Sequence, residues 1–208
     1  MSASGKRRLG RPPASSSADT RERILDVARQ CFAELGYEST TNKYVSSRAN
    51  ITTGAIYHYF DSKLEIYAAV HDDLQERVYR RFEDAVESED TFVGKLHAVL
   101  DTSHQLNVED PSVAQFLGAA RTDARRHPEV AEAIGTFGPI RDGFYRRMID
   151  RGVETGEIAA GDEDGMLALL TTVLIGLTDA LSHDADRQRI AIDALKELFD
   201  GELVSPPT

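Results

Sequence analysis

Apolar residues recur at helical spacing along almost the whole chain. The first such stretch begins at Asp19 or Thr20 and stops at Gly36, a residue that commonly follows the end of a helix. Its apolar positions are Ile24, Leu25, Ala28, Cys31, Phe32 and Leu35. No stretch alternates apolar and polar residues as a half-buried strand does. The pattern therefore predicts an all-α protein.

Two short helices follow, from about residue 40 to 49 and from about 52 to 60. Asn50 lies between them, and asparagine tolerates the left-handed conformation of a tight turn. Helix caps are available at Thr40 or Thr41, at Thr52 or Thr53, and at Asp61 or Ser62. A longer helix should run to about residue 88, with Leu64, Tyr67, His71, Leu74, Val78, Phe82 and Ala85 turned inward. We expect further helices over 91–107, 111–126, 129–154, 163–183 and 186–200, about nine in all.

The longest apolar stretch, Met166 to Leu181, covers nearly all sides of one helix, which must therefore be buried on more than one face. It is short for a membrane span and contains Thr171, Thr172, Thr178 and Asp179. The N-terminus is basic but no apolar run follows it, so we expect no secretory signal. The single cysteine, Cys31, forms no intramolecular disulfide, which suits a reducing compartment. We expect a cytoplasmic protein that makes no membrane contact.

Charge is divided unevenly along the chain. Residues 1–60 hold nine Lys and Arg against five Asp and Glu, a net charge of +4. Since the whole chain has a net charge of −11, the remaining residues carry −15. Phosphates attract the first part and repel the second. We expect a flexible basic arm over 1–18, a DNA-binding domain over 19–63 and a second domain over 64–208.

Two short helices joined by a tight turn in a basic region make a candidate helix-turn-helix. Small and hydroxylated residues at Thr52-Thr53-Gly54-Ala55 allow close approach to a phosphate or a base edge, helped by the helix dipole. Tyr57, His58 and Tyr59 follow in succession. Three successive ring side chains of one helix cannot all face a core, so at least one should point outward, where it can contact phosphate.

The run Thr40-Thr41 and Ile51 to Lys63, with Ile-Tyr-His-Tyr-Phe-Asp-Ser-Lys at its end, resembles the signature of the TetR family of bacterial regulators. The resemblance spans residues 20 to 70. It implies that Thr53, Gly54 and Ala55 read bases with support from Thr41 and Lys43, and that Tyr57, His58 and Lys63 contact phosphates. Ile56 and Phe60 then pack the domain. Three positions depart from the family pattern: Asn42 replaces an aliphatic residue, Tyr44 an acid, and Thr53 a frequent lysine.

The N-terminal arm contains Gly10-Arg11-Pro12 after a basic run that includes Arg8. A flexible arm of this kind inserts arginine into a narrow minor groove. A solvated basic tail is the equal alternative.

The resemblance also implies a symmetric homodimer that binds operator DNA, most often a repressor, and a small-molecule effector held in the second domain. We expect the dimer to form through the last two helices, at Leu170, Leu174, Leu177, Leu181, Leu195 and Phe199, although a core helix within one chain is the alternative. We expect a mostly apolar cavity for a lipophilic ligand, lined by Leu96, Leu100, His104, Phe116, Arg121, Phe144 and Met148. Arg121 is a candidate for an anionic group, although cations at a helix C-terminus are ordinary.

Other chemistries find little support. His97 and His104 lie seven residues apart, and His71 precedes them, which is not the usual spacing of metal ligands. Phosphate loops, nucleophile elbows and Cys-x-x-Cys motifs do not occur. We therefore expect no metal, no cofactor and no catalysis. Two alternatives stay open: a structural DNA-binding protein with a filled second-domain core, and an all-α enzyme.

Overall fold

A computed structural model describes residues 17–135, 138–201 and 203. Within these ranges the chain forms ten helices and no strand, which confirms the all-α class. The helices are α1 (Ser17–Ser39), α2 (Asn42–Arg48), α3 (Thr53–Tyr57), α4 (Lys63–Val86), α5 (Phe92–Glu109), α6 (Pro111–Arg126), α7 (Pro128–Ile134), α8 (Gly138–Thr155), α9 (Glu163–Leu181) and α10 (Ala185–Phe199).

The helix predicted over 129–154 is two helices, α7 and α8. Gly135 follows the end of α7, and Pro139 lies in the first turn of α8. Proline has no N–H to donate and is readily placed only in a first turn, so a single helix through this region was the wrong prediction. The N-terminal helix also begins at Ser17, two residues before its predicted start.

Caps and turns set the helix ends in the N-terminal third. The side chains of Thr41, Thr52 and Ser62 each accept a hydrogen bond, at 3.1 Å, from the backbone N–H three residues on. Gly36 has φ +75°, which interrupts α1 as predicted before one more turn follows. Asn50 has φ +51°, the left-handed conformation expected at the turn. The third helix ends earlier than predicted, at Tyr57.

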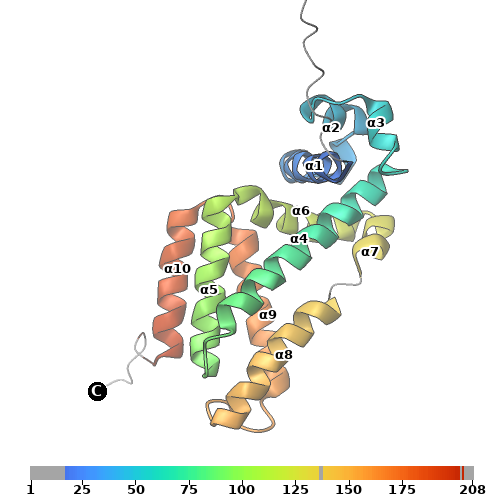
Figure 1. Cartoon of the computed structure of the whole chain (residues 1–208). Helices are drawn as coiled ribbons and strands as arrows, with labels where there is room; N and C mark the ends of the chain where they lie inside the picture. Colours follow the sequence, from blue (N-terminus) through green and yellow to red (C-terminus); the bar gives the residue numbers. More distant parts are fainter. Residues whose placement is uncertain (1–16, 136–137, 202, 204–208) are drawn as a thin grey trace, which may run out of the picture.

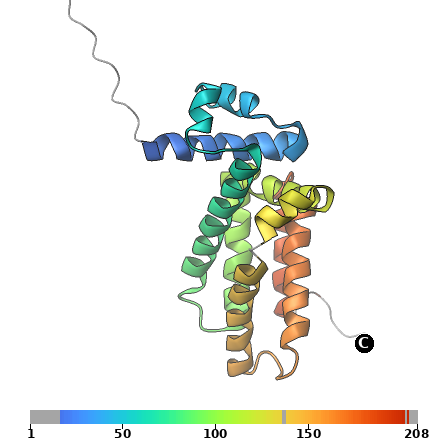
Figure 2. The same cartoon turned by 90° about the vertical axis from the view of Figure 1, so that its right-hand side faces the viewer.

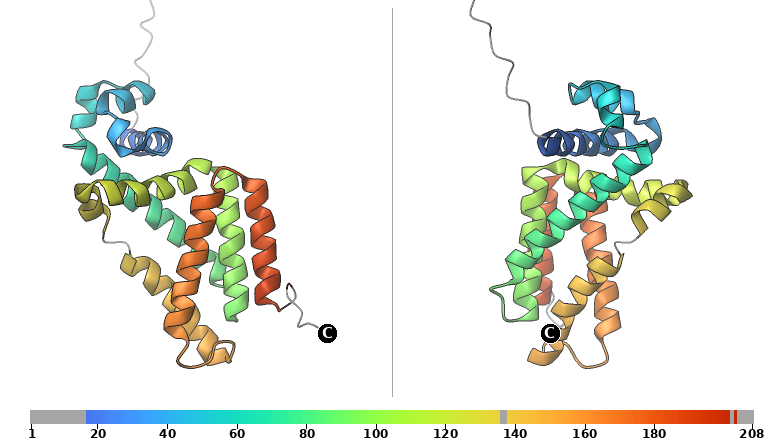
Figure 3. Two further views of the ribbon diagram at one scale, coloured as in Figure 1. Left: turned by 180° about the vertical axis from the view of Figure 1, so that it is seen from behind. Right: turned by 45° about the vertical axis from the view of Figure 1, so that its right-hand side comes forward.

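We call α1–α3 the head and α4–α10 the body. In Figures 1 and 2, α1 lies across one end of the body, and α2 and α3 lie on its far side. Helix α4 begins in the head and runs diagonally down the body. Helix α6 lies beneath α1, while α5, α9 and α10 extend away from the head side by side (Figure 3).

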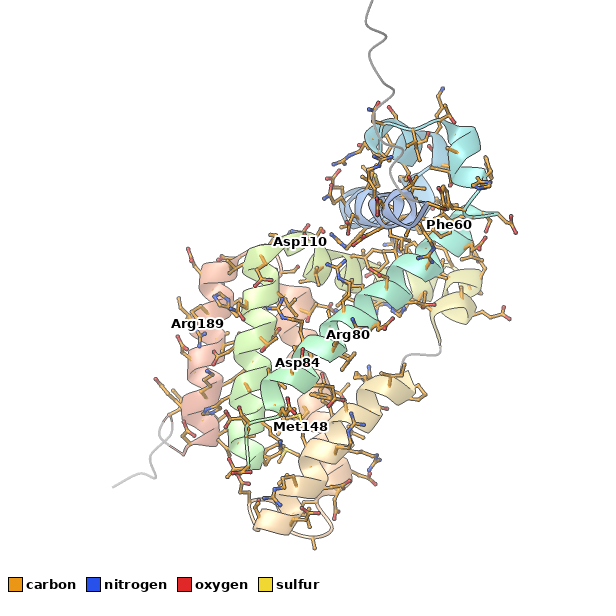
Figure 4. The ribbon with its side chains drawn as sticks, viewed as in Figure 1. Phe60, Arg80, Asp84, Asp110, Met148 and Arg189 are labelled. Carbon is orange, nitrogen blue, oxygen red and sulfur yellow. The ribbon has the colours of Figure 1, made fainter. Side chains whose placement is uncertain are left out.

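Buried polar contacts join the head to the body. Arg29 of α1 is 4% exposed, and its guanidinium donates to Asp26 at 2.9 Å, to Asp110 at 2.6 Å and to Ser112 at 2.9 Å. Asp110 lies at the corner between α5 and α6, next to the head (Figure 4). Because three oxygens satisfy the guanidinium, its burial is tolerated, and the contact ties α1 to the start of α6.

A second contact joins the far end of α6 to the head. The buried carboxylate of Asp123 accepts the Tyr37 backbone N–H at 3.0 Å and the Tyr67 hydroxyl at 2.9 Å. Around it, the Phe32 and Tyr67 rings meet edge to face with centroids 4.7 Å apart, and Phe116 lies 5.1 Å from Tyr67. One continuous core therefore runs through the junction.

Among the described residues, α9 is the one helix long and apolar enough to cross a membrane. The mean hydropathy of its apolar stretch is 1.5, and 17% of that stretch is buried within the chain. By itself this is weak evidence for a membrane, because a helix covered by a partner subunit has the same composition. It does show that much of the apolar surface of α9 is uncovered in a single chain.

Candidate nucleic-acid interface and ligand cavity

Five of the residues predicted to contact DNA gather around one open hollow on the head. The hollow measures about 540 Å³ and lies between the starts of α2, α3 and α4. Its lining includes the predicted residues Thr41, Lys43, Thr53, Tyr57 and Lys63, together with Thr40, Asn42, Asp61 and Ser62. Residues from three separate segments of sequence thus share one surface.

The start of α3 is held by its own threonines. Thr52 uses its hydroxyl oxygen as the helix cap, on the Ala55 N–H. Thr53 is half-buried, and its hydroxyl lies 3.0 Å from that of Ser46, which is 3% exposed on α2. This hydrogen bond fixes the two helices relative to each other. Gly54 is exposed and Ala55 is half-buried, so both reach the surface beside Thr53.

The aromatic residues after α3 divide between surface and core. Tyr57 is 55% exposed and His58 is exposed, so these two rings point outward. Tyr59 is half-buried against the His58 ring, with centroids 5.2 Å apart. Ile56 and Phe60 are 0% and 2% exposed and fill the centre of the head, where Figure 4 labels Phe60. Outward and packing positions fall as the sequence indicated.

Lys63 has a structural partner that the sequence did not suggest. Its ammonium donates to the carbonyl oxygens of Tyr37 at 2.7 Å and Glu38 at 3.2 Å, and it lies 4.1 Å from the centre of the Tyr37 ring. Burial lowers the pKa of Lys63, and neighbouring carboxylates oppose this effect. The residue therefore holds the last turn of α1 in addition to bordering the hollow.

The positive charge of the head is less available than its sequence implies. Arg29 is buried at the junction with the body. Arg48 forms an ion pair with Glu34 at 2.5 Å. Among the described residues of the head, Arg21, Arg23 and Lys43 are the exposed cations that form no ion pair with a described carboxylate. Arg8 and Arg11, predicted to enter a minor groove, lie outside the described residues.

A cavity of about 270 Å³ opens in the body between α4, α5, α6, α8 and α9, with the end of α7 at its edge. Its apolar wall comprises Val78, Phe82, Leu106, Val113, Ala114, Leu117, Ala120, Ile134, Leu174 and Ile175. Its polar wall comprises His71, Gln75, Tyr79, Ser103, Asn107, Arg121, Arg141, Tyr145 and Thr178. Most of the cavity surface by area is apolar, and the polar groups that interrupt it can orient a ligand, as is typical of a small-molecule site.

Of the seven residues predicted to line a cavity, Arg121 does so. Leu96, Leu100 and Phe116 are at most 2% exposed and pack in the core, and His104 lies 3.2 Å from Gln188 on α10. Phe144 and Met148 border a separate surface hollow beside α4. Helical periodicity identifies an apolar face, but it does not distinguish a face that meets another helix from one that meets a void.

The polar lining residues that the sequence analysis did not select share one signal. His71, Asn107 and Tyr145 are polar residues on the buried faces of helices, and each is less than 7% exposed. Burial lowers the pKa of His71 to about 4, with Arg121 acting in the same direction. Burial raises the pKa of Tyr145 to about 12, and it also raises that of Tyr79 beside it. At neutral pH the side chains of His71, Tyr79 and Tyr145 are therefore uncharged.

Both arginines of the cavity carry an acidic partner. Arg121 on α6 pairs with Asp179 on α9 through Nε and Nη2, and Nε lies 3.0 Å from Oδ1. Arg141 pairs with its neighbour Asp142 at 2.8 Å. All four side chains are between 28% and 42% exposed, so the pairs lie at the edge of the cavity.

The arrangement of a helix-turn-helix head on a helical body matches known proteins. The family model described as "Bacterial regulatory proteins, tetR family" matches residues 24–70. The HTH-type transcriptional regulator SrpR of Pseudomonas putida is 30% identical over 200 residues, which cover 96% of this chain and 92% of that protein. The chain belongs to the TetR family.

Two further matches agree. The HTH-type transcriptional repressor Rv1474c of Mycobacterium tuberculosis is 32% identical over 178 residues, covering 84% of this chain and 88% of its own. The structure of Salmonella enterica GusR superposes with a TM-score of 0.74 at 25% identity, covering 91% of this chain and 98% of that one. The protein is thus a TetR-family transcriptional regulator with a DNA-binding domain.

The residues predicted to join two TetR-family subunits are largely turned inward. Leu170, Leu174 and Leu177 are 1%, 9% and 6% exposed within the single chain. Leu181, Leu195 and Phe199 are partly buried against the same core. The apolar side chains that α9 and α10 leave uncovered are others: Leu169 is 45%, Ile190 68% and Leu198 48% exposed. The predicted residues therefore lie mainly on the core-facing sides of α9 and α10, and the uncovered apolar side chains lie elsewhere on these two helices.

The histidines lie apart from one another. His97 is 3.6 Å from Asp200, His104 contacts Gln188, and His71 lines the cavity. No group of three or more His, Cys, Asp or Glu in the part of the chain that the structure describes is arranged to hold a metal ion.

Proposed function

We propose that this TetR-family protein is a ligand-responsive repressor that leaves its operator when a small molecule binds the cavity of the body. The observation that carries the proposal is the coexistence of two sites in one chain: the exposed surface around Thr41, Lys43 and Tyr57, and the mostly apolar cavity of about 270 Å³. The DNA-binding domain covers residues 19–63, and the ligand-binding and dimerisation domain covers 64–208. Such a protein acts in the cytoplasm, associated with the nucleoid when bound to DNA.

Repression is supported by the name of the relative Rv1474c, a transcriptional repressor 32% identical to this chain. The cavity favours a ligand over the alternative of a purely structural DNA-binding protein, which would have a filled second core. Among the described residues, the geometry provides no site that favours a structural protein or an enzyme.

Helix α6 is the element through which ligand and DNA binding are coupled in this proposal. It lines the cavity with Val113, Ala114 and Leu117, and it holds the head through Ser112 and Asp123. A ligand that prefers a different position of α6 would shift the head with it. The ligand changes the equilibrium between the two positions of α6 by no more free energy than the difference between its binding free energies for them.

A homodimer supplies the second head. Of the uncovered apolar residues, Leu169 lies on α9, most of which the single chain does not bury, and Ile190 and Leu198 lie on α10. Two heads held in a fixed relation must match half-sites roughly 34–36 Å apart, so a modest change in their spacing releases DNA.

Operator binding tests the head. Tyr57→Phe should weaken binding by a similar factor on any sequence, because phosphate contacts carry no sequence information. Lys43→Ala should reduce the salt slope by about one unit, because it removes an exposed positive charge from this surface. Ala55→Ser should instead change which bases are preferred. Arg80→Ala, on the exposed surface of α4 in the body, is the matched control and should bind DNA as the wild type does. Fluorescence anisotropy with selected operators measures all four, and unchanged binding in the three head variants would contradict the assignment.

A further inference from the structure

We propose that the cavity of the body takes an anionic amphiphile: a compact molecule with a carboxylate, an apolar middle and a hydroxyl or N–H donor. The inference rests on the proposed function, because it takes this cavity as the effector site and adds the chemical class of the effector. Three features of the wall support it: the sign of its charges, an unpartnered carbonyl, and the apolar surface between them.

The charged side chains that line the cavity are of one sign. Among the described residues of the wall, Arg121 and Arg141 are charged, and no Asp or Glu lines it. His71 is neutral at pH 7, since burial lowers its pKa to about 4. A cationic ligand would meet two guanidinium groups without a carboxylate in the wall, whereas an anion would find two donors able to bind a carboxylate with paired hydrogen bonds.

The present partners of the two arginines are replaceable. Asp179 and Asp142 are about two-fifths exposed, so water solvates either carboxylate when a ligand takes its place. The Arg121 pair also links α6 to α9 across the edge of the cavity. An anionic ligand that competes with Asp179 therefore acts directly on α6, the helix that holds the head.

Asn107 offers a ligand an unpaired hydrogen-bond acceptor. Its side chain lines the cavity and is 2% exposed. Its Nδ2 donates to Gln188 Oε1 at 3.0 Å, while Oδ1 is buried without a hydrogen-bond partner. A buried carbonyl left unpaired costs free energy, which a ligand hydroxyl or N–H would recover.

The wall between these polar groups is apolar, with Phe82, Leu106, Val113 and Leu117 among its members. A volume of about 270 Å³ admits a fused aromatic ring system or a short aliphatic chain. Burial of this apolar part of the ligand supplies affinity, while the arginines and Asn107 select the polar groups at its ends.

Calorimetric titration of the full chain with three matched probes tests the class. The probes are 6-hydroxy-2-naphthoate, its carboxamide, and 2-naphthoate, which lacks the hydroxyl. We expect 6-hydroxy-2-naphthoate to bind about tenfold or more tightly than either of the others, because each loses one hydrogen bond to a buried or charged group.

Variants assign the two preferences to residues. Arg121→Gln and Arg141→Gln should reduce the preference for carboxylate over carboxamide. Asn107→Leu should abolish the preference for 6-hydroxy-2-naphthoate over 2-naphthoate and keep the preference for carboxylate over carboxamide. A general loss of packing would weaken the binding of all three probes instead. Arg146→Gln, on the exposed side of α8 where it pairs with Asp164, is the control and should change neither ratio.

Equal binding of 6-hydroxy-2-naphthoate and its carboxamide, or no binding of any probe by a chain that still binds its operator, would overturn the inference and leave the DNA-binding part of the proposed function standing. Selective binding of the hydroxynaphthoate without release of the operator would support the ligand class and contradict ligand-induced release.

Discussion

His71 shows how position alone determines the charge state of a residue. It is 6% exposed on α4, where burial and the nearby Arg121 lower its pKa to about 4. In the unfolded chain a histidine titrates near 6.5. The unfolded state therefore binds more protons than the folded state between these two values, and stability falls as the pH falls through that range.

We predict that the free energy of unfolding decreases by about 2 kcal/mol between pH 7 and pH 5 through His71 alone. His71→Gln should remove this part of the pH dependence, whatever its effect on packing. Denaturant unfolding of the wild type and the variant at pH 7 and pH 5 measures the change in the free energy of unfolding of each protein. The difference between the two proteins at pH 7 gives the effect of the substitution on packing. Equal pH dependence in the two proteins would show that His71 is not held neutral.

Arg29 shows the limit of counting charges. The sequence places it in the basic N-terminal region, but helical spacing puts it on the face of α1 that meets α6, where it is 4% exposed. Its acidic partner Asp110 is 81 residues away in sequence. No local pattern identifies such a pair, because the two residues meet only when α6 packs beneath α1.

At the scale of helices, Gly152 of α8 marks a close approach. A Cβ at this position would lie 2.6 Å from Ile158 Cδ1 and 2.9 Å from Phe92 Cβ, which belongs to α5. Any larger residue must push the ends of α5 and α8 apart. Gly143, in the same helix, would place its Cβ no closer than 3.8 Å to Arg147 Nη1.

We predict that Gly152→Ala destabilises the fold by about 1–3 kcal/mol through overpacking. Gly143→Ala is the matched control and should be neutral or stabilising by up to about 1 kcal/mol, since alanine is the better helix former. Chemical denaturation of both variants tests the difference. Two variants of equal stability would mean that α5 and α8 are not in close contact.

At the scale of the whole molecule, a single chain leaves apolar side chains of α9 and α10 exposed to solvent, and a second subunit would bury them. We predict that the double variant Leu169→Glu/Ile190→Glu converts a dimer into monomers of 22.9 kDa, because charges buried in an apolar interface lack partners. Sedimentation velocity measures the mass. Val108→Glu, exposed at 58% near the end of α5, is the control and should remain dimeric. A dimeric double variant would place the interface elsewhere.

The hydrophobic pattern and the local motifs determined much of this protein. They predicted the all-α class, caps at Thr52 or Thr53 and at Asp61 or Ser62, and the left-handed Asn50, because these features depend on neighbours within one helical turn. The family resemblance added the packing of Ile56 and Phe60. The family signature is also local, since it lies within residues 20 to 70.

Only the tertiary structure decided which faces meet. It placed Lys63 on the end of α1, turned Leu170 and Leu174 into the chain, and lined the cavity with Asn107 and Arg141 instead of the predicted Leu96 and Leu100, which pack in the core. A helix presents the same apolar spacing to a neighbouring helix, to a partner subunit and to a void. The difference lies in how far apart the helices are held, which is set by side chains distant in sequence.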